Sequence, residues 1–335
     1  MPVLVHSIHY GDQMIGPSNL RISLDRRESN ADIDFVSHAH TDHVAAVRSS
    51  NGVLASNQTI QLIEKSHNVT VRKSTGGQNL RLIEAGHMLG SKQLCTYDEK
   101  SGNSVTYTGD FQISKSKTSK PIEVVDTDIL IVDSTYADPF MNFSDKNEVE
   151  SALQDWTLSK LRSGIVIFSA YALGKAQELI AIMNGAGIKP IVSRKISVAA
   201  GVYVKNGINL DYCSAYESDA EYNELVRGDF VGITDSRNLS AFKSTLEHAH
   251  SKSVYTAVAT GFAKVFRFNT DAQFPLSDHA DFAQCKEYID ATGAKKVLTY
   301  GQNMRSLANN LQKEGYDSMP FEGTSLALQS KQLNI

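Results

Sequence analysis

Short apolar segments separated by turns dominate the first 110 residues. Residues 20–25, 32–38 and 80–86, for example, are rich in valine, isoleucine, leucine and phenylalanine, which is typical of β-strands. Residues 127–135 then form an uninterrupted apolar run that ends in polar residues, as expected for a strand buried on both faces. The pattern predicts a strand-dense first part of the chain.

The spacing of apolar residues becomes helical at about residue 145. Between residues 145 and 163, Leu153, Trp156, Leu158 and Leu161 fall near one face of a helix. We expect Gly164 to end this helix, because glycine often follows the last turn of a helix.

Strands and helices alternate after this helix. A strand at residues 165–171, a helix at 176–187 and a strand at 189–193 predict a parallel α/β unit. Residues 252–260 are typical of another strand, and residues 281–301 of a helix, a glycine stop and a strand. The chain is therefore expected to be a β-rich scaffold interrupted by an α/β insert.

Length and composition describe an ordinary globular protein. The chain has 335 residues, of which 41 % are hydrophobic and only 7 are prolines, unlike a disordered or fibrous protein. No segment approaches the ~20 apolar residues of a membrane span, and the N-terminal residues do not form a signal peptide. We therefore expect a cytoplasmic protein with no membrane partner.

Charge and cysteine content narrow the choice of ligands. Three cysteines, odd in number and far apart, argue against a disulfide framework and a cysteine-based zinc site. A net charge of −4 gives no general attraction to nucleic acid, so such a partner needs a local basic patch. The loop at residues 111–121 carries Lys115, Lys117 and Lys120, although a solvated loop without a ligand is equally consistent with this charge.

The strongest local signal is the segment SHAHTDH at the end of a predicted strand. Alternation places His38 and His40 on the same side of the chain, and Asp42 and His43 follow on the turn. Imidazole and carboxylate groups are ligands that zinc accepts, and burying them without a metal is costly. We predict a metal site here.

Two further polar residues also follow predicted strands. His87 lies in EAGHMLGS, after an apolar run, and Asp110 lies in VTYTGDF. Each alone is a weak signal, because a histidine in a glycine-flanked turn is more often structural. Their order along the chain and their positions at strand ends make them candidates for the remaining ligands.

HAHTDH, AGHMLGS and YTGDF together resemble the ligand series of the metallo-β-lactamase superfamily. The resemblance implies a first zinc site with the ligands His38, His40, His87 and Asp110. It also implies a second metal held by Asp42 and His43, with Asp110 shared between the two sites.

Two later motifs resemble those of the β-CASP nucleases within this superfamily. LIVDSTYADP resembles their acidic motif and FPLSDHADF their next motif, which implies that Asp133 lies behind the metals and that His279 contacts the scissile phosphate. The segments SAYALGKAQELI and TGFAKV are similar to the small bacterial and archaeal nucleases of the group, including the ligase-associated exonucleases.

The resemblance also implies the architecture. We expect an α/β protein in which residues 1–144 and 270–335 form an αββα metallo-β-lactamase sandwich. Residues 145–269 would form the inserted α/β cap domain of the β-CASP group.

One position departs from the pattern of the RNA-processing members. They usually place a histidine that completes the second metal site before a glycine, where this chain has Tyr300. A phenol with a pKa of ~10 is a poor zinc ligand at neutral pH, so we expect one firmly bound zinc and a weaker second site. Artemis-like DNA nucleases also lack this histidine and carry a Thr-Tyr-x-x-Pro pattern similar to residues 135–139, which favours DNA.

The resemblance implies roles in phosphodiester hydrolysis. A metal would lower the pKa of water toward ~7, Asp42 would orient that water, and Asp133 would hold a ligand imidazole. His279 would contact the phosphate or protonate the leaving oxygen. Gly174 and Lys175 open a predicted helix after a strand, and this helix N-terminus is either a phosphate contact or an ordinary strand–helix turn.

Four functions are weighed on the sequence, and the last of them, a catalytically inactive binding subunit, is opposed by the intact ligand series from His38 to Asp110. The first is a DNA nuclease, working from an end, in repair. The second is a ribonuclease in RNA 3′-end processing or maturation, for which the motifs would be the same. The third is a small-molecule hydrolase of the lactamase or thioesterase kind, against which Asp133, His279 and the insert argue.

Overall fold

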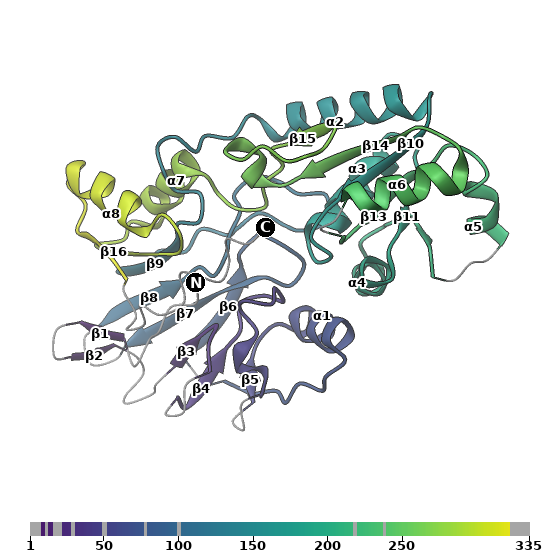
Figure 1. Ribbon diagram of the computed structural model, residues 1–335. Coiled ribbons are helices and arrows are strands. Elements are labelled where there is room, and N and C mark those ends of the chain that lie inside the picture. The colour runs from purple at the N-terminus through teal and green to yellow at the C-terminus, as the bar shows by residue number, and fades with distance from the viewer. Residues whose placement is uncertain are drawn as a thin grey trace. The chain divides into compact units, whose positions relative to one another are not determined.

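A computed structural model describes nine stretches of the chain: residues 8–10, 13–15, 22–27, 31–48, 52–76, 79–98, 102–216, 220–236 and 239–321. They belong to two compact units, labelled by element in Figure 1. Unit 1 takes the residues described within 1–115, 119–142 and 279–335, and unit 2 takes residues 116–118 and those within 143–278.

Unit 1 contains a mixed six-stranded sheet. Its strand order is β17-β16-β9-β8-β7-β6. The hairpin strands β6, β7 and β8 pair antiparallel, whereas β8, β9, β16 and β17 pair parallel. The strands are β6 (Leu80–Glu84), β7 (Lys92–Asp98), β8 (Asn103–Tyr107), β9 (Ile129–Asp133), β16 (Lys296–Tyr300) and β17 (Ser318–Pro320).

Smaller sheets complete the strands of unit 1. A parallel sheet has the order β3-β4-β5 and an antiparallel pair joins β1 to β2. Their strands are β1 (Ile8–Tyr10), β2 (Gln13–Ile15), β3 (Ile22–Leu24), β4 (Ile33–Phe35) and β5 (Val53–Leu54).

Strand β9 shows how the six-stranded sheet is buried on both faces. Ile129 and Ile131 pack in one hydrophobic cluster with residues of β3 and β4. Leu130 and Val132 pack in a second cluster with residues of helices α7 (Phe282–Thr292) and α8 (Met304–Lys313). Because side chains alternate along a strand, the uninterrupted apolar run serves both faces, as the sequence predicted.

The first part of the chain is less purely β than the sequence pattern predicted. Helix α1 (Asn57–His67) and the short 3₁₀ helix η1 (Ala45–Arg48) interrupt it. Residues 52–57 have the same short apolar pattern as the other predicted strands, but β5 ends at Leu54. Ser56 caps α1 by accepting a hydrogen bond from the Thr59 amide at 3.0 Å, so a serine that resembles a turn residue in sequence starts a helix.

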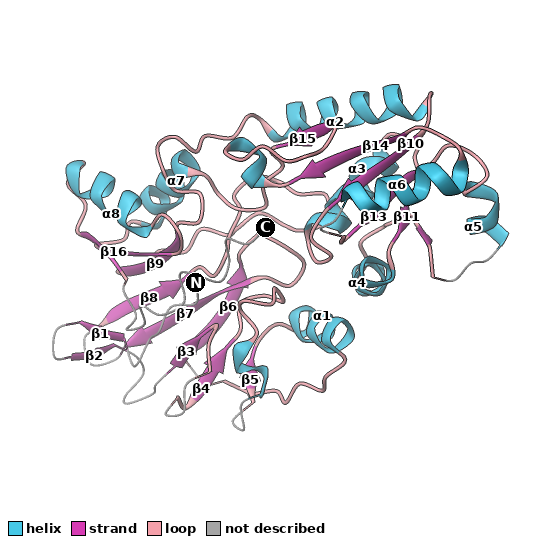
Figure 2. Ribbon diagram, viewed as in Figure 1, coloured by secondary structure: helices cyan, strands magenta, loops and turns pink. Residues whose placement is uncertain are grey.

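Unit 2 is an α/β unit with an all-parallel sheet, which confirms the predicted strand–helix–strand pattern (Figure 2). The order β12-β11-β13-β10-β14-β15 pairs parallel throughout. The strands are β10 (Ile165–Ser169), β11 (Ile191–Val192), β12 (Cys213–Ser214), β13 (Val231–Thr234), β14 (Val254–Ala259) and β15 (Ala272–Phe274).

Helices alternate with these strands along the chain. They are α2 (Lys146–Leu161), α3 (Lys175–Gly185), α4 (Arg194–Lys205), α5 (Ala220–Leu225), α6 (Leu239–His250) and the 3₁₀ helix η2 (Gly261–Lys264). No helix among the described residues is long and apolar enough to span a membrane.

Two glycines predicted to stop helices have different roles. Gly293 follows α7 in the left-handed conformation, with φ of 61°, as expected for a helix C-terminal glycine. Gly164 is not in that conformation, and α2 is closed by Arg162 instead. A Cβ at Gly164 would lie 2.2 Å from the Ser253 carbonyl oxygen, so glycine is required there for close backbone approach.

Candidate metal centre

The polar residues predicted from the sequence gather at one edge of the six-stranded sheet. Because β7 runs antiparallel between β6 and β8, the carboxyl ends of β6, β8, β9 and β16 meet at the same edge. His87 and Asp110 follow β6 and β8, and Asp133 and Tyr300 end β9 and β16. His38 follows β4 of the smaller sheet, so two sheets supply the site.

Four donor atoms of this cluster converge. His40 Nδ1 lies 3.1 Å from His38 Nε2 and 3.1 Å from His87 Nε2. Asp110 Oδ2 lies 3.5 Å from His38 Nε2 and 3.9 Å from His87 Nε2. The ligand atoms of a tetrahedral zinc site are separated by about 3.3 Å, given bonds of ~2.0–2.1 Å. These four side chains can therefore hold a metal ion.

The protonation states of this set also suit a cation. Burial and the neighbouring His43 lower the pKa of His38 well below its usual value, which favours the neutral imidazole that binds metals. Burial opposes the charge of Asp110, but His43, His279 and His38 outweigh it and lower the pKa of this carboxyl. The set thus combines neutral imidazole with a carboxylate.

A second group of predicted ligands adjoins the same carboxylate. His43 Nε2 lies 3.4 Å from Asp110 Oδ2 and 3.7 Å from Asp42 Oδ2. The Asp42 side chain is 49 % exposed, whereas His43 is buried. Asp42 is therefore the member of the cluster that water and a ligand can reach most easily.

Tyr300 is buried in the core between the six-stranded sheet and the β3-β4-β5 sheet of unit 1. Its ring lies 5.1 Å from that of Tyr107. Burial, together with the negative charges of Asp133 and Asp110, raises the pKa of the Tyr300 phenol well above its ordinary value. A phenol that keeps its proton is a poor zinc ligand, which is consistent with the prediction of a weaker second site.

Asp25, which the sequence analysis did not single out, holds the second group in place. It accepts hydrogen bonds from the Tyr107 hydroxyl at 2.8 Å and from the Ser37 amide at 2.6 Å. Its Oδ2 also lies 2.8 Å from His43 Nδ1, and carboxylate partners of this kind orient ligand imidazoles. Asp25 directly follows β3, as the predicted ligands follow their strands, and this position is the feature of the sequence that could have identified it.

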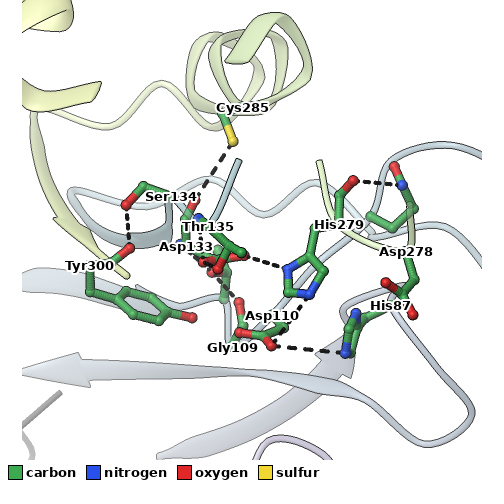
Figure 3. Close-up of polar contacts among 12 residues, drawn as sticks. His87, Gly109, Asp110, Asp133, Ser134, Thr135, Asp278, His279, Cys285 and Tyr300 are labelled. Carbon is green, nitrogen blue, oxygen red and sulfur yellow. Dashed lines mark hydrogen bonds and ion pairs between the residues drawn. The ribbon is translucent and has the colours of Figure 1, made fainter. Parts of the chain in front are cut away.

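Asp133 orients His279 (Figure 3). Asp133 Oδ2 lies 3.0 Å from His279 Nδ1, while its Oδ1 accepts bonds from the Thr135 amide and hydroxyl at 2.9 and 2.7 Å. The other ring nitrogen, His279 Nε2, faces Asp110 Oδ2 at 3.8 Å. Tyr136 packs edge-on against the His279 ring, 5.5 Å between centroids. The imidazole is therefore fixed with one nitrogen aimed at the metal-binding group.

The turn that carries His87 depends on helix α1. Ser56 and Thr59, in the first turn of that helix, donate hydrogen bonds to the Gly90 carbonyl at 2.7 and 2.9 Å. Gly86 must be glycine, because a Cβ there would lie 2.2 Å from the Gln112 carbonyl oxygen. The helix that the sequence pattern missed thus positions a predicted ligand.

The three loop lysines are exposed and are divided between the two units. Lys115 follows a segment fixed beside His279, because Gln112 donates to the His279 carbonyl at 2.9 Å. Lys117 belongs to unit 2 and pairs with Glu150 at 3.0 Å. Lys120 lies in unit 1.

Gly174 and Lys175 begin helix α3 as predicted. The Lys175 side chain is only 3 % exposed, and its amine lies 3.2 Å from Asp278 Oδ1. Burial lowers the pKa of this amine, and Asp278 partly offsets the effect. An internal ion pair therefore engages the charge of this lysine, for which the sequence left a phosphate contact and an ordinary strand–helix turn both open.

Curated relatives show what the chain is similar to. It is 26 % identical over 293 residues to a probable DNA ligase of Opitutus terrae, covering 85 % of this chain and 28 % of that protein. It is 32 % identical over 116 residues to an RNase J-like protein of Methanocaldococcus jannaschii, covering 34 % of this chain and 27 % of the relative.

A plant repair protein gives a third match. The chain is 27 % identical over 172 residues to the DNA cross-link repair protein SNM1 of Arabidopsis thaliana, covering 46 % of this chain and 35 % of that protein. The chain thus spans about a quarter to a third of the length of these three relatives. No family model matches the chain.

Fold, site and relatives agree on a class. The fold and the site describe an α/β protein with a histidine–aspartate group at its strand ends that is able to hold a metal ion. The chain belongs to the β-CASP nuclease group of the metallo-β-lactamase superfamily, as its motifs predicted.

Proposed function

We propose that the protein is a metal-dependent nuclease that hydrolyses phosphodiester bonds of nucleic acid. The observation that carries the proposal is the pairing of two features at one sheet edge. One is the convergent group of His38, His40, His87 and Asp110. The other is His279, whose Nε2 lies 3.8 Å from the same Asp110.

His38, His40, His87 and Asp110 would hold one zinc ion. The ion would lower the pKa of water toward ~7 and polarise a phosphate oxygen. Asp42, His43 and the shared Asp110 would hold a second metal more weakly, because the protonated Tyr300 offers no fourth charged ligand.

The other roles in hydrolysis fall to Asp42, Asp133 and His279. Asp42 is the exposed carboxylate of the group and would orient the attacking water. Asp133 holds His279 through Nδ1, and Nε2, which faces Asp110, would contact the phosphate and donate a proton to the leaving oxygen. Asp133 is thus a positioning residue and His279 a catalytic one.

We further propose that the two units are the two domains expected for the group. Unit 1 would be the αββα sandwich, supported by its two sheets with α7 and α8 packed on one and α1 following the last strand of the other. Unit 2 would be the β-CASP cap, expected at residues 145–269, and the unit itself takes residues 143–278 together with 116–118.

The preferred polymer is DNA, attacked from an end in repair. The departure at Tyr300 and the pattern over residues 135–139 support this preference, as do relatives named as a DNA ligase and a DNA cross-link repair protein. A relative named as RNase J-like supports the second candidate function, a ribonuclease in RNA processing. A small-molecule hydrolase has less support, because a lactam or thioester does not need His279.

The test is a panel of end-labelled single- and double-stranded DNA and RNA, with and without a chelator. We expect chelator-sensitive cleavage of DNA, and His279→Ala should retain its metal but lose cleavage. Cleavage of RNA alone would change the polymer. Efficient turnover of a lactam or thioester that His279→Ala leaves intact, with no cleavage of either polymer, would refute the nuclease.

A further inference from the structure

The carboxyl edge of the unit 2 sheet carries exposed aromatic side chains and an arginine. All strands of this sheet are parallel, so their carboxyl ends share one edge. Tyr171 follows β10, Arg194 follows β11 and Tyr216 follows β12. Tyr171 is 54 % exposed and Tyr216 is 63 % exposed. Large exposed aromatic groups along one sheet edge indicate a surface for a ligand rather than for folding.

Arg194 and Tyr216 form a cation–π pair. The guanidinium carbon of Arg194 lies 4.2 Å from the centroid of the Tyr216 ring, a favourable cation–π distance. Among the residues that the structure describes, no carboxylate forms an ion pair with Arg194, whereas its neighbour Lys195 pairs with Asp235 at 3.0 Å. The first turn of α4, which Arg194 begins, has no acidic residue either. The positive charge of Arg194 is therefore available to an anion.

The same edge leads to His279. Strand β15 ends at Phe274, and the chain reaches Asp278 four residues later, directly before His279. Lys175, which follows β10, holds Asp278 by an ion pair at 3.2 Å. The segment that ends in the proposed catalytic histidine thus leaves unit 2 from the edge that presents Tyr171 and Arg194.

The spacing along this edge suits a polymer. In the order β12-β11-β13-β10-β14-β15, three strand intervals separate β12 from β10 and two more reach β15. At ~4.8 Å per interval these correspond to about 14 Å and about 10 Å. The loops that carry Tyr216 and Tyr171 are therefore too far apart for both rings to contact the same base.

We propose that this edge binds an unpaired strand of nucleic acid, with bases stacked on Tyr216 and Tyr171 and Arg194 contacting the backbone. The inference rests on the proposed nuclease function and names the form of its substrate. Exposed rings with an arginine are the elements that bind single strands. Bases in a duplex already stack on one another, so the rings offer a duplex much less.

The experiment measures binding separately from cleavage. Fluorescein-labelled 12-nucleotide single-stranded DNA is titrated with the protein in the presence of a chelator, and binding is followed by fluorescence anisotropy. Tyr216→Ala and Tyr171→Ala should each weaken binding by about 5- to 100-fold, since stacking contributes ~1–3 kcal/mol per base. Tyr216→Phe keeps the ring and should bind nearly as well as the parent protein, whereas Arg194→Ala should also reduce the salt dependence of binding.

A matched control lies at the opposite end of the same sheet. Lys160 lies over the ring of Tyr255 at 5.0 Å, and Tyr255 is the second residue of β14. Tyr255→Ala removes a comparable cation–π pair far along the strand from the carboxyl edge, and it should leave binding unchanged. An equal loss in Tyr255→Ala and Tyr216→Ala would assign the effect to stability and overturn the proposal.

Kinetics and fluorescence distinguish this inference from the nuclease itself. With bis(p-nitrophenyl) phosphate as a small substrate, Tyr216→Ala should match the parent, while KM for the oligonucleotide rises and kcat stays constant. Tyr216→Trp should lose tryptophan emission on addition of the single strand. Binding with stacking but without cleavage would refute only the nuclease. Unchanged single-strand binding in Tyr171→Ala/Tyr216→Ala, or an equal loss with blunt duplex, would refute only the surface.

Discussion

The two sheet edges that carry polar residues differ in how those residues are arranged. At the edge in unit 1, donor atoms from His38, His40, His87 and Asp110 converge within 4.8 Å of one another. At the carboxyl edge in unit 2, Tyr171, Arg194 and Tyr216 follow separate strands of a single sheet.

The number of sheets explains the difference. Unit 1 brings strand ends from two sheets together, since His38 follows β4 and His87 follows β6, and two sets of ends can surround a point. One sheet can only space its strand ends in a row, at ~4.8 Å intervals. The first arrangement suits an ion and the second suits a chain-like ligand.

Burial separates the two edges as well. His38 is 0 % exposed and His87 is 4 % exposed, whereas Tyr216 is 63 % exposed. Buried polar side chains lose their hydrogen bonds to water, so they need hydrogen bonds or ion pairs with one another to offset the cost of burial. Substitutions in unit 1 should therefore have larger effects than those at the exposed edge of unit 2.

The largest effect is expected for Asp110→Asn, which removes a carboxylate that faces His38, His43, His87 and His279. Loss of a metal ligand should cost several kcal/mol of transition-state stabilisation, or about 1,000-fold in activity. Elemental analysis should show metal content well below that of the parent. Asp128→Asn, an acidic residue of the same unit that belongs to no metal-binding group, serves as the control. Full metal content in Asp110→Asn would contradict the assignment.

The next effect concerns stability and the buried charge of unit 2. Lys175→Met would leave Asp278 without its cation, and we expect a loss of about 2–3 kcal/mol in the free energy of unfolding, because Asp278 keeps some contact with water. Denaturant unfolding measures it. Lys175→Met/Asp278→Asn should recover much of the loss, and Lys175→Arg should lose less. If the double variant were as unstable as Lys175→Met, packing rather than charge would be responsible.

Asp25→Asn tests the residue that holds His43. Asp25 has φ of 57°, a conformation that asparagine adopts readily, so this variant changes the charge without straining the backbone. We expect activity or affinity for the second metal to fall by about 10- to 100-fold, as for other partners of metal ligands. Metal titration with circular dichroism as a folding control measures this, and unchanged affinity and activity would make Asp25 structural only.

The smallest effect is at the entry to β9, where Asp128 accepts hydrogen bonds from Lys295 and Ser104. These partners lower the pKa of Asp128 to about 2. Because the pKa of Asp128 is lower in the folded state, ionised Asp128 stabilises the fold at pH values above its unfolded-state pKa of ~3.9. This contribution disappears as the pH falls from about 4 to 2. Because the pair is mostly solvated, we expect less than about 1 kcal/mol. Asp128→Asn should remove this part of the acid dependence in denaturant titrations between pH 2 and 5.

The local motifs were predictable because each combines a short strand with a polar end. His38, His87, Asp110 and Asp133 follow or end predicted strands, and the structure brings all four to one site. The apolar run of β9 and the glycine stop after α7 also follow from local rules. Such features depend on residues near in sequence, so pattern and spacing are sufficient to find them.

Other features depend on residues distant in sequence. Asp25 becomes a partner of His43 only when β3 and β4 pair, which brings residues eighteen positions apart to 2.8 Å. Gly164 belongs to a close approach to Ser253, almost ninety residues later. The burial of Lys175 against Asp278 is a third case, since neither segment alone indicates that this lysine faces inward.

The sequence by itself determined the α/β class, the order of the ligand motifs and the types of donor, because periodicity and residue chemistry are local properties. Tertiary structure decided which nitrogen of each histidine faces the centre, that Asp133 holds His279, and that Lys175 is engaged internally. It also decided that exposed rings share one sheet edge with the segment leading to His279. These outcomes depend on strand pairing between distant segments, which sets distance and burial together and which no local pattern encodes.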